Sequence, residues 1–215
     1  MRFRSTKAAG SFDCSKPGSF ELLVHMEADP HCCSYAQFDF KAFLPSRLAR
    51  ELDDMAAYTL RHRAGSYVVC AKPPRAIYSS AYNYCWNELD AVLARRNMWL
   101  FSATPKELRR EPQWSNALGI AKAAQTLIDP SDYERVVAYL SAVGPARVRD
   151  CLKFCDSGVD SFDALLGLVS SGVVFLDPPG DLSLDGELRL DPPPGCELNA
   201  IGWLHDTSAG HPSER

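Results

Sequence analysis

The stretch SYVVCAKPP, residues 66–74, joins a run of β-forming residues to a lysine and two prolines. The run 67–69 predicts a buried strand, and the prolines end it because proline has no amide hydrogen to give a neighbouring strand. Side chains alternate along a strand, so Cys70 and Lys72 should point to the same face. A lysine at a strand end can position water beside a metal ion, although such a lysine is more often a solvated strand end.

The residues around this strand predict an α/β core from residue 18 to about residue 125. Residues 53–60 are expected to form a hairpin with it through the turn 61–65, although Ala56 and Ala57 lower the strand propensity. The other expected elements are a helix over 18–29, a strand over 34–44, a helix over 81–97, a strand over 98–104 and helices over 104–113 and 116–128.

Composition indicates a folded protein without a membrane segment. The chain has 215 residues, of which 46% are hydrophobic, which is enough for a packed core. Its start carries basic residues but no apolar run behind them, and no apolar run reaches a membrane-spanning length. We therefore expect a cytoplasmic protein that makes no membrane contact. The eight cysteines contain no CxxC pair, so reduced thiols are expected rather than disulfides or zinc.

Charge is distributed unevenly along the chain. Residues 1–110 contain 16 Lys and Arg against 11 Asp and Glu, whereas residues 111–215 contain 7 against 16. A basic first half fits contact with phosphate, and an acidic second half fits a protein partner better than DNA. Ordinary variation of surface charge explains the difference equally well.

The second half of the chain predicts a different, mostly helical unit. Helices are expected over 131–144, 145–158 and 160–172, each closed by a glycine or followed by one. A hairpin is expected over 173–190, and three helices with a two-stranded wing make a winged-helix-like domain. The third helix has no Arg or Lys, so we expect protein docking rather than base reading.

These patterns divide the chain into four parts. A loose basic lead is expected over 1–17, a catalytic core over 18–128, the winged-helix-like domain over 129–190 and a tail over 191–215. The tail is apolar enough to dock on a partner, and packing against its own domain is an equal alternative.

Carboxylates that could hold a metal lie on the first expected helix and at the start of the hairpin. Glu21 lies in the first turn of the first expected helix, and Asp53 and Asp54 open the first hairpin strand. Mg²⁺ takes oxygen ligands, so these residues with Lys72 could form a hydrolytic site. Each carboxylate taken alone has a plainer interpretation as a loop or helix-start residue.

The order of these motifs resembles the TnsA family, the endonuclease subunit of heteromeric bacterial transposases. The motifs in order are GSFELLVHMEADP, YAQFDF, DD, YVVCAKPP and WLFSATPKELRREPQWSNALGIAK, and the resemblance covers about residues 17–190. It implies a restriction-endonuclease-like mixed sheet with flanking helices, followed by the winged-helix-like domain.

The resemblance also implies a set of site residues. Glu21 matches the family's helix glutamate, and Lys72 matches its lysine. Asp54 matches the central aspartate, because sixteen residues separate it from Cys70 as in the family, and Asp53 is the second choice. Cys70 departs from the usual Gln or Glu.

A thiol is a poor ligand for Mg²⁺. The backbone carbonyl of Ala71 could replace it as a third ligand, leaving Cys70 as a neutral wall. Gln37, from the family's Gln-containing strand, is a further second choice. The basic turn Arg61–Arg63, with His62 between the arginines, could touch DNA backbone phosphate, although a solvated turn is the plainer interpretation.

The function that the resemblance implies is cleavage of the 5′ ends of a transposon by Mg²⁺-dependent phosphodiester hydrolysis, with Mn²⁺ as a substitute. Its partners would be transposon-end DNA, a DDE-type transposase and an AAA+ ATPase regulator. The alternative is an inactive nuclease relic that binds the transposase and the regulator as an assembly subunit. A third possibility, a restriction-type nuclease acting alone, is disfavoured because no expected helix carries base-reading residues.

Overall fold

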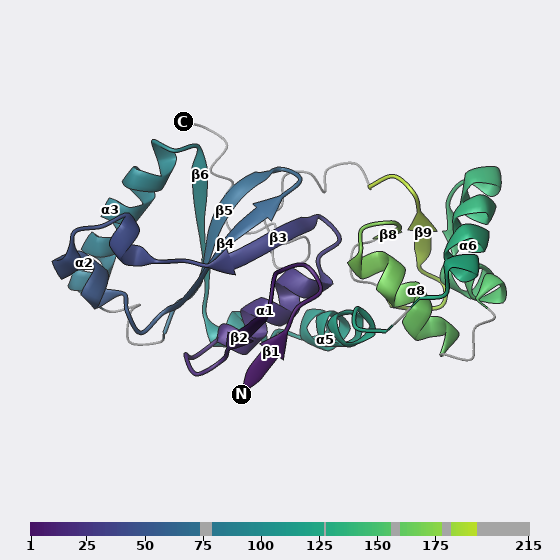
Figure 1. The fold of residues 1–215 in the computed structure, drawn as a ribbon, viewed down its shortest axis with the longest axis horizontal. Helices are drawn as coiled ribbons and strands as arrows, with labels where there is room; N and C mark the ends of the chain where they lie inside the picture. The colour runs from purple at the N-terminus through teal and green to yellow at the C-terminus, as the bar shows by residue number, and fades with distance from the viewer. Residues whose placement is uncertain (74–78, 127, 156–159, 178–181, 193–215) are drawn as a thin grey trace.

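A computed structural model describes residues 1–73, 79–126, 128–155, 160–177 and 182–192 of this protein (Figure 1). The tail expected over 191–215 therefore lies outside the described residues from position 193 onward. Within the described residues, no helix is both long enough and apolar enough to span a membrane.

The first half of the chain is built on a mixed four-stranded sheet with the strand order β3-β4-β5-β6. The two pairs β3/β4 and β4/β5 are antiparallel, and β5/β6 is parallel. The parallel pair is joined by the helix α3, which crosses from one strand to the next. The elements are α1 (Ser19–Ala28), β3 (Cys32–Gln37), η1 (Phe40–Ala42), α2 (Ser46–Glu51), β4 (Ala56–His62), β5 (Gly65–Ala71), α3 (Ser80–Ala94), β6 (Met98–Ala103), α4 (Pro105–Leu108) and α5 (Gln113–Ala123).

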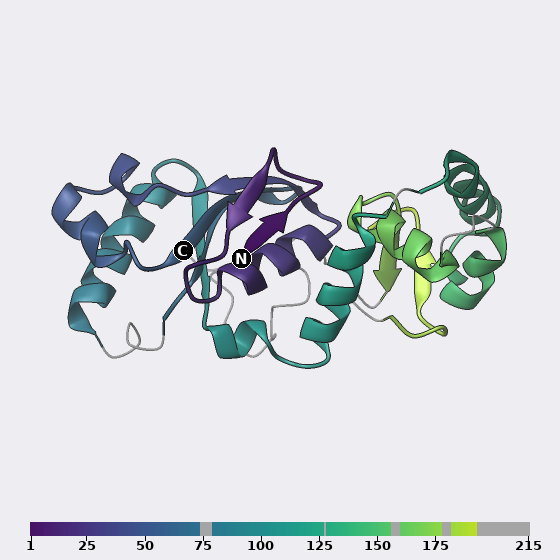
Figure 2. The ribbon, with the colours of Figure 1, turned by 60° about the horizontal axis from the view of Figure 1, so that its bottom comes forward.

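Helices cover both faces of this sheet, as the two ribbon views show (Figures 1 and 2). The α1 and α5 face shares one buried cluster with Val69 and Ala71 of β5. The opposite face packs Val68 and Cys70 against α2 and α3 in a second cluster. The alternation expected for residues 66–72 is therefore present, and it separates the two sides of the β5 end.

The expected hairpin and α/β class are confirmed, and the strand expected over 34–44 is partly wrong. β4 and β5 pair from Ala56↔Ala71 to His62↔Gly65, around the turn that the sequence indicates. β3 ends at Gln37 and is followed by the turn η1, where the Asp39 side chain accepts a hydrogen bond from the Lys41 amide at 2.9 Å. This local cap competes with a continued strand.

The lead over 1–17 is more ordered than the sequence indicates. Its strands β1 (Arg2–Arg4) and β2 (Ser11–Asp13) form an antiparallel hairpin. Phe3 is buried, and the ring of Phe12 packs on Tyr35 and Tyr58. The intervening loop places Thr6 on the fully buried carboxylate of Glu27, where the Thr6 amide donates at 2.7 Å. These contacts lie in the tertiary structure, which explains why a short basic segment gave no local signal.

The second half contains the expected first and third helices and the strands of the expected hairpin. The helix expected over 145–158 is partly wrong, because residues 146–147 form an additional strand and only short helical turns over 148–154 follow it in the described residues. Its sheet has the order β7-β9-β8, because Ala146 and Arg147 pair with Leu188 and Glu187. The elements are α6 (Pro130–Val143), β7 (Ala146–Arg147), α7 (Val148–Cys151), η3 (Leu152–Phe154), α8 (Ser161–Ser170), β8 (Phe175–Asp177) and β9 (Glu187–Arg189).

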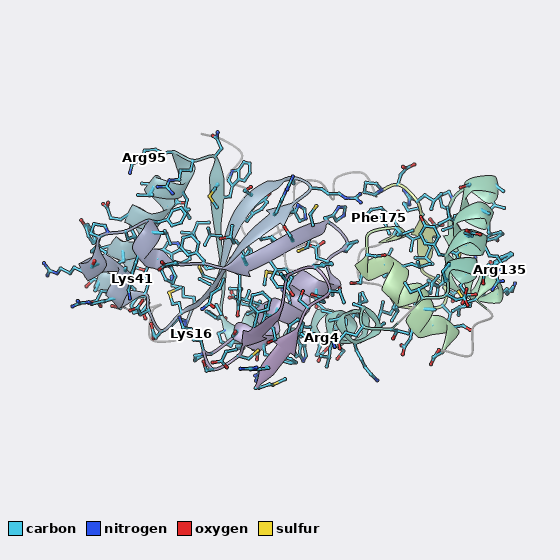
Figure 3. The ribbon with its side chains drawn as sticks, viewed as in Figure 1. Arg4, Lys16, Lys41, Arg95, Arg135 and Phe175 are labelled. Atoms are coloured by element: carbon cyan, nitrogen blue, oxygen red, sulfur yellow. The ribbon has the colours of Figure 1, made fainter. Side chains whose placement is uncertain are left out.

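The two halves share one continuous hydrophobic core at the helix α8. This helix is buried along most of its length and packs against α5 and α1. The Ser170 hydroxyl donates to the Glu27 carbonyl at 2.8 Å, which ties α8 to the end of α1. Phe175 sits at the junction (Figure 3), where the Arg63 guanidinium lies 5.0 Å from its ring centre. The third helix of the second half is therefore an internal packing surface.

Candidate functional site

The elements that carry Glu21, Asp54 and Lys72 meet at one end of the sheet. Asp54 lies just before β4 and Lys72 just after β5, and these strand ends are paired. The first turn of α1 approaches the same place closely. Gly18, with φ of 75°, precedes it, and a Cβ on Gly18 would lie 2.4 Å from the Cβ of Ala71. The elements that carry the three residues therefore approach one another at this end of the sheet.

The side chains of Asp54 and Lys72 turn toward the α3 side of the sheet. The Tyr82 hydroxyl on α3 donates a hydrogen bond to Asp54 Oδ1. The Lys72 ammonium lies 5.6 Å from the ring centre of Trp86, also on α3. A cation over an aromatic face is stabilised there, so Lys72 is held on this side.

Glu21 is engaged on the α1 side by the segment that follows β6. Its side chain is 5% exposed, and Oε1 accepts hydrogen bonds from Arg109 Nε at 2.6 Å and from Arg109 Nη2. One turn along α1, His25 Nε2 lies 2.7 Å from the Leu108 carbonyl oxygen. Glu21 and His25 thus share the helix face that docks on α4. Glu21 therefore makes its contacts on the α1 side of the sheet, whereas Asp54 and Lys72 make theirs on the α3 side.

Cys70 is a core residue. It is fully buried in the cluster between the sheet and helices α2 and α3. Burial raises the pKa of its thiol far above the usual range, so the group stays protonated. This corrects the expectation of a cleft wall, because the side chain is enclosed by the core. Ala71 is 1% exposed and is paired on both sides, with Ala56 and with Ala103, so its backbone does not face an open cleft.

The second-choice carboxylate Asp53 lies between two surface hollows at the same sheet end. Asp53 and Asp54 line one hollow of about 490 Å³. Asp53 also lines the other, of about 360 Å³, together with Gln37, Lys16 and Lys41. Lys16 and Lys41 lie on this end of the molecule (Figure 3).

The expected Mg²⁺ site does not fit the side chains present. Mg²⁺ needs several oxygen ligands in near-octahedral geometry. Among the described residues, no group of three or more His, Cys, Asp or Glu side chains could hold a metal ion. Glu21 is already paired with an arginine, and Cys70 offers no oxygen. The same argument applies to Mn²⁺, which prefers similar ligands.

The basic turn is divided between the surface and the interior. His62 is 3% exposed: its Nδ1 accepts a hydrogen bond from the Ala64 amide at 3.0 Å, and its Nε2 faces Asp29 at 3.5 Å. A buried imidazole cannot reach a phosphate, which corrects the expectation for His62. Arg63 donates to the Gly172 carbonyl at 3.2 Å, so it serves the junction, while Arg61 is exposed.

This turn also lies at the wrong end of the hairpin for a shared site. Arg61, the first residue of the turn, lies seven positions after Asp54, which corresponds to roughly 20 Å along the strand.

Three partners of the candidate residues were missed by sequence reasoning. Tyr82 lies 28 residues from Asp54, and Arg109 lies 88 residues from Glu21. Trp86 is a third. The sequence pattern placed all three partners on expected helices. It gave no local signal of which distant residue each of these polar or aromatic side chains would contact.

No match was found among protein-family models, curated proteins or solved structures. The functional argument for this chain therefore depends on its own residues and geometry.

Proposed function

We propose that this chain is a nuclease-like subunit of a bacterial heteromeric transposase, and that it acts in assembly of the complex rather than in cutting DNA. The order α1-β3-β4-β5-α3-β6, with two antiparallel strand pairs and then a parallel one, supports a restriction-endonuclease-like core. The order α6-β7-α7-α8-β8-β9, with the sheet order β7-β9-β8, supports a winged-helix-like second domain.

One observation carries the non-catalytic part of the proposal. At the paired ends of β4 and β5, the facing residues are Ala56 with Ala71 and Ala57 with Cys70. None of these side chains has an oxygen. A hydrolytic centre between these strand ends would need carboxylates there to hold its metal, whereas the neighbouring Glu21 is bound by Arg109.

The second domain fits protein docking better than DNA reading. Its third helix, α8, is buried against α5 and α1 and cannot enter a major groove. Basic side chains on its small sheet and on the adjoining helix α7 pair with carboxylates: Arg147 and Arg149 with Asp185, and Arg189 with Asp177 at 3.0 Å. Paired charges release few DNA counterions. A DDE-type transposase and an AAA+ regulator are the partners of the proposed assembly.

A second candidate is the active Mg²⁺-dependent endonuclease that cuts transposon 5′ ends. It is favoured by the position of Asp54 and Lys72, which lie at one sheet end and turn toward the same helix. Among the described residues, however, no group of three or more His, Cys, Asp or Glu side chains could hold a metal ion beside them.

Cleavage of end DNA separates the two candidates. The chain is mixed with its transposase and with transposon-end DNA labelled so that 5′-end and 3′-end cuts are resolved, in Mg²⁺ and in Mn²⁺. We expect 3′-end cutting that requires the chain and no 5′-end cutting by wild type. Asp54→Ala and Lys72→Ala should leave the pattern unchanged, as should Asp90→Ala, a control on the exposed side of α3.

The opposite result supports the endonuclease. Wild-type 5′-end cutting that Asp54→Ala abolishes and Asp90→Ala retains would reject the assembly proposal. Failure of the chain to associate with the transposase or with end DNA would reject both candidates.

A further inference from the structure

We propose that Arg109 takes the place of a metal ion at Glu21, so that a guanidinium on the surface neutralises this buried carboxylate. The inference deepens the proposed non-catalytic function and rests on it. It arises because the side chains of the described residues do not fit a metal ion, while Glu21, one of the expected ligands, is buried and paired with an arginine.

Glu21 needs a fixed positive charge. Its side chain is 5% exposed and lies on a helix packed into the main cluster. An ionised carboxylate taken out of water is costly unless it is paired and hydrogen-bonded. Arg109 supplies both requirements, since Nε and Nη2 both donate to Glu21 Oε1. A guanidinium is always charged and presents its donors as a rigid fork.

The position of Arg109 is built into the chain by several contacts. It follows α4, which begins with a complete capping box between Thr104 and Glu107 and has Pro105 in its first turn. Leu108 is fully buried, and its carbonyl oxygen contacts His25 on α1. Arg109 thus follows an anchored turn that packs on α1, within reach of Glu21.

The neighbouring positions explain why a metal would not compete. The strand ends beside the first turn of α1 carry alanines and a buried thiol. Asp54 accepts a hydrogen bond from Tyr82 on the other face of the sheet. Within the described residues, Glu21 belongs to no group of three or more His, Cys, Asp or Glu side chains that could hold a metal ion, whereas Mg²⁺ binds poorly without a full oxygen shell.

Thermal unfolding of the full chain, with and without millimolar Mn²⁺, tests the inference. Arg109→Gln should lower Tm by roughly 3–8 °C, because it leaves a buried carboxylate without its charged partner. Glu21→Gln/Arg109→Gln should regain most of that loss, since replacing both partners leaves no unpaired charge. Lys106→Gln removes an equal charge from an exposed position of α4 and should change Tm by about 1 °C or less. Mn²⁺ should shift none of these values.

Two results would overturn the inference. An unchanged Tm in Arg109→Gln would mean that Glu21 does not depend on the guanidinium. A Tm of wild type that rises with Mn²⁺, and no longer rises in Glu21→Gln, would make Glu21 a metal ligand. Calorimetric titration of Mn²⁺ into both proteins checks the second result directly.

The outcome is distinguishable from failure of the proposed function. Suppose that wild type cuts 5′ ends although Mn²⁺ gives wild type and Glu21→Gln the same Tm shift and the same titration. In that case the assembly proposal fails and the role of Arg109 stands. If Mn²⁺ binds through Glu21 but no 5′-end cutting occurs, the role of Arg109 fails and the assembly proposal stands.

Discussion

Replacing Cys70 by glutamine is the sharpest test of the placement of this strand. The substitution restores a residue type usual at this position in the family that the sequence resembles, so an open site would accept it. In the structure, Cys70 is fully buried among Val68 and helices α2 and α3. We therefore expect Cys70→Gln to destabilise the protein and to add no metal ligand.

The magnitude follows from two separate costs. Glutamine is larger than cysteine, and overpacking a well-filled core costs about 1–3 kcal/mol. Its amide would be buried without an evident partner, which costs about 1–3 kcal/mol more. The sum, roughly 2–6 kcal/mol, corresponds to a fall in Tm of roughly 4–20 °C for a chain of this length.

The assay is urea unfolding followed by tryptophan fluorescence and circular dichroism. Cys70→Ala, which only removes the sulfur, should cost about 1–2 kcal/mol. Cys33→Gln is the matched control, because Cys33 is exposed on β3; it should change stability by less than about 0.5 kcal/mol. A Cys70→Gln protein as stable as wild type would show that position 70 opens onto a cleft and would refute the core assignment.

Three further predictions address the junction, pH and the start of α1. Phe175→Ala should cost about 3–5 kcal/mol, because the buried ring packs on Arg63 and His31; it should also speed limited proteolysis between the halves. Burial lowers the pKa of both His25 and His31 below 6.5, so the native state binds fewer protons than the unfolded chain. Stability should therefore fall as pH drops below 6.5. Urea midpoints at successive pH values measure this fall, and a midpoint independent of pH over that range contradicts it. Gly18→Ala should cost about 2–4 kcal/mol, because Gly18 has positive φ and its added Cβ would meet Ala71; calorimetry that finds wild-type Tm would contradict the close approach of α1 to β5.

The sequence by itself determined the local elements and their order. Alternating and continuous apolar runs indicated the hairpin of residues 53–72, and the expected helix start at residue 104 agrees with α4, which Thr104 caps. Glycines at or after the helix ends indicated α6 and α8. These signals are local, because hydrogen bonds within a turn or helix and the burial of one face act over a few residues. The same patterns placed Glu21, Asp54 and Lys72 on elements that do meet.

Only the tertiary structure decided what these side chains contact. A shift of one residue along a strand exchanges its two faces. Here Cys70 is buried in the cluster under α2 and α3, and Ala71 is buried in the cluster under α1 and α5. The arginine that pairs with Glu21 lies 88 residues away, and α8 became an internal surface because α5 and α1 cover it. Likewise, Phe3 and Phe12 made an ordered hairpin of a lead that the sequence indicated as loose. Such pairings depend on how whole elements pack, and packing sums many weak contacts between residues far apart in sequence, which no short stretch of the chain encodes.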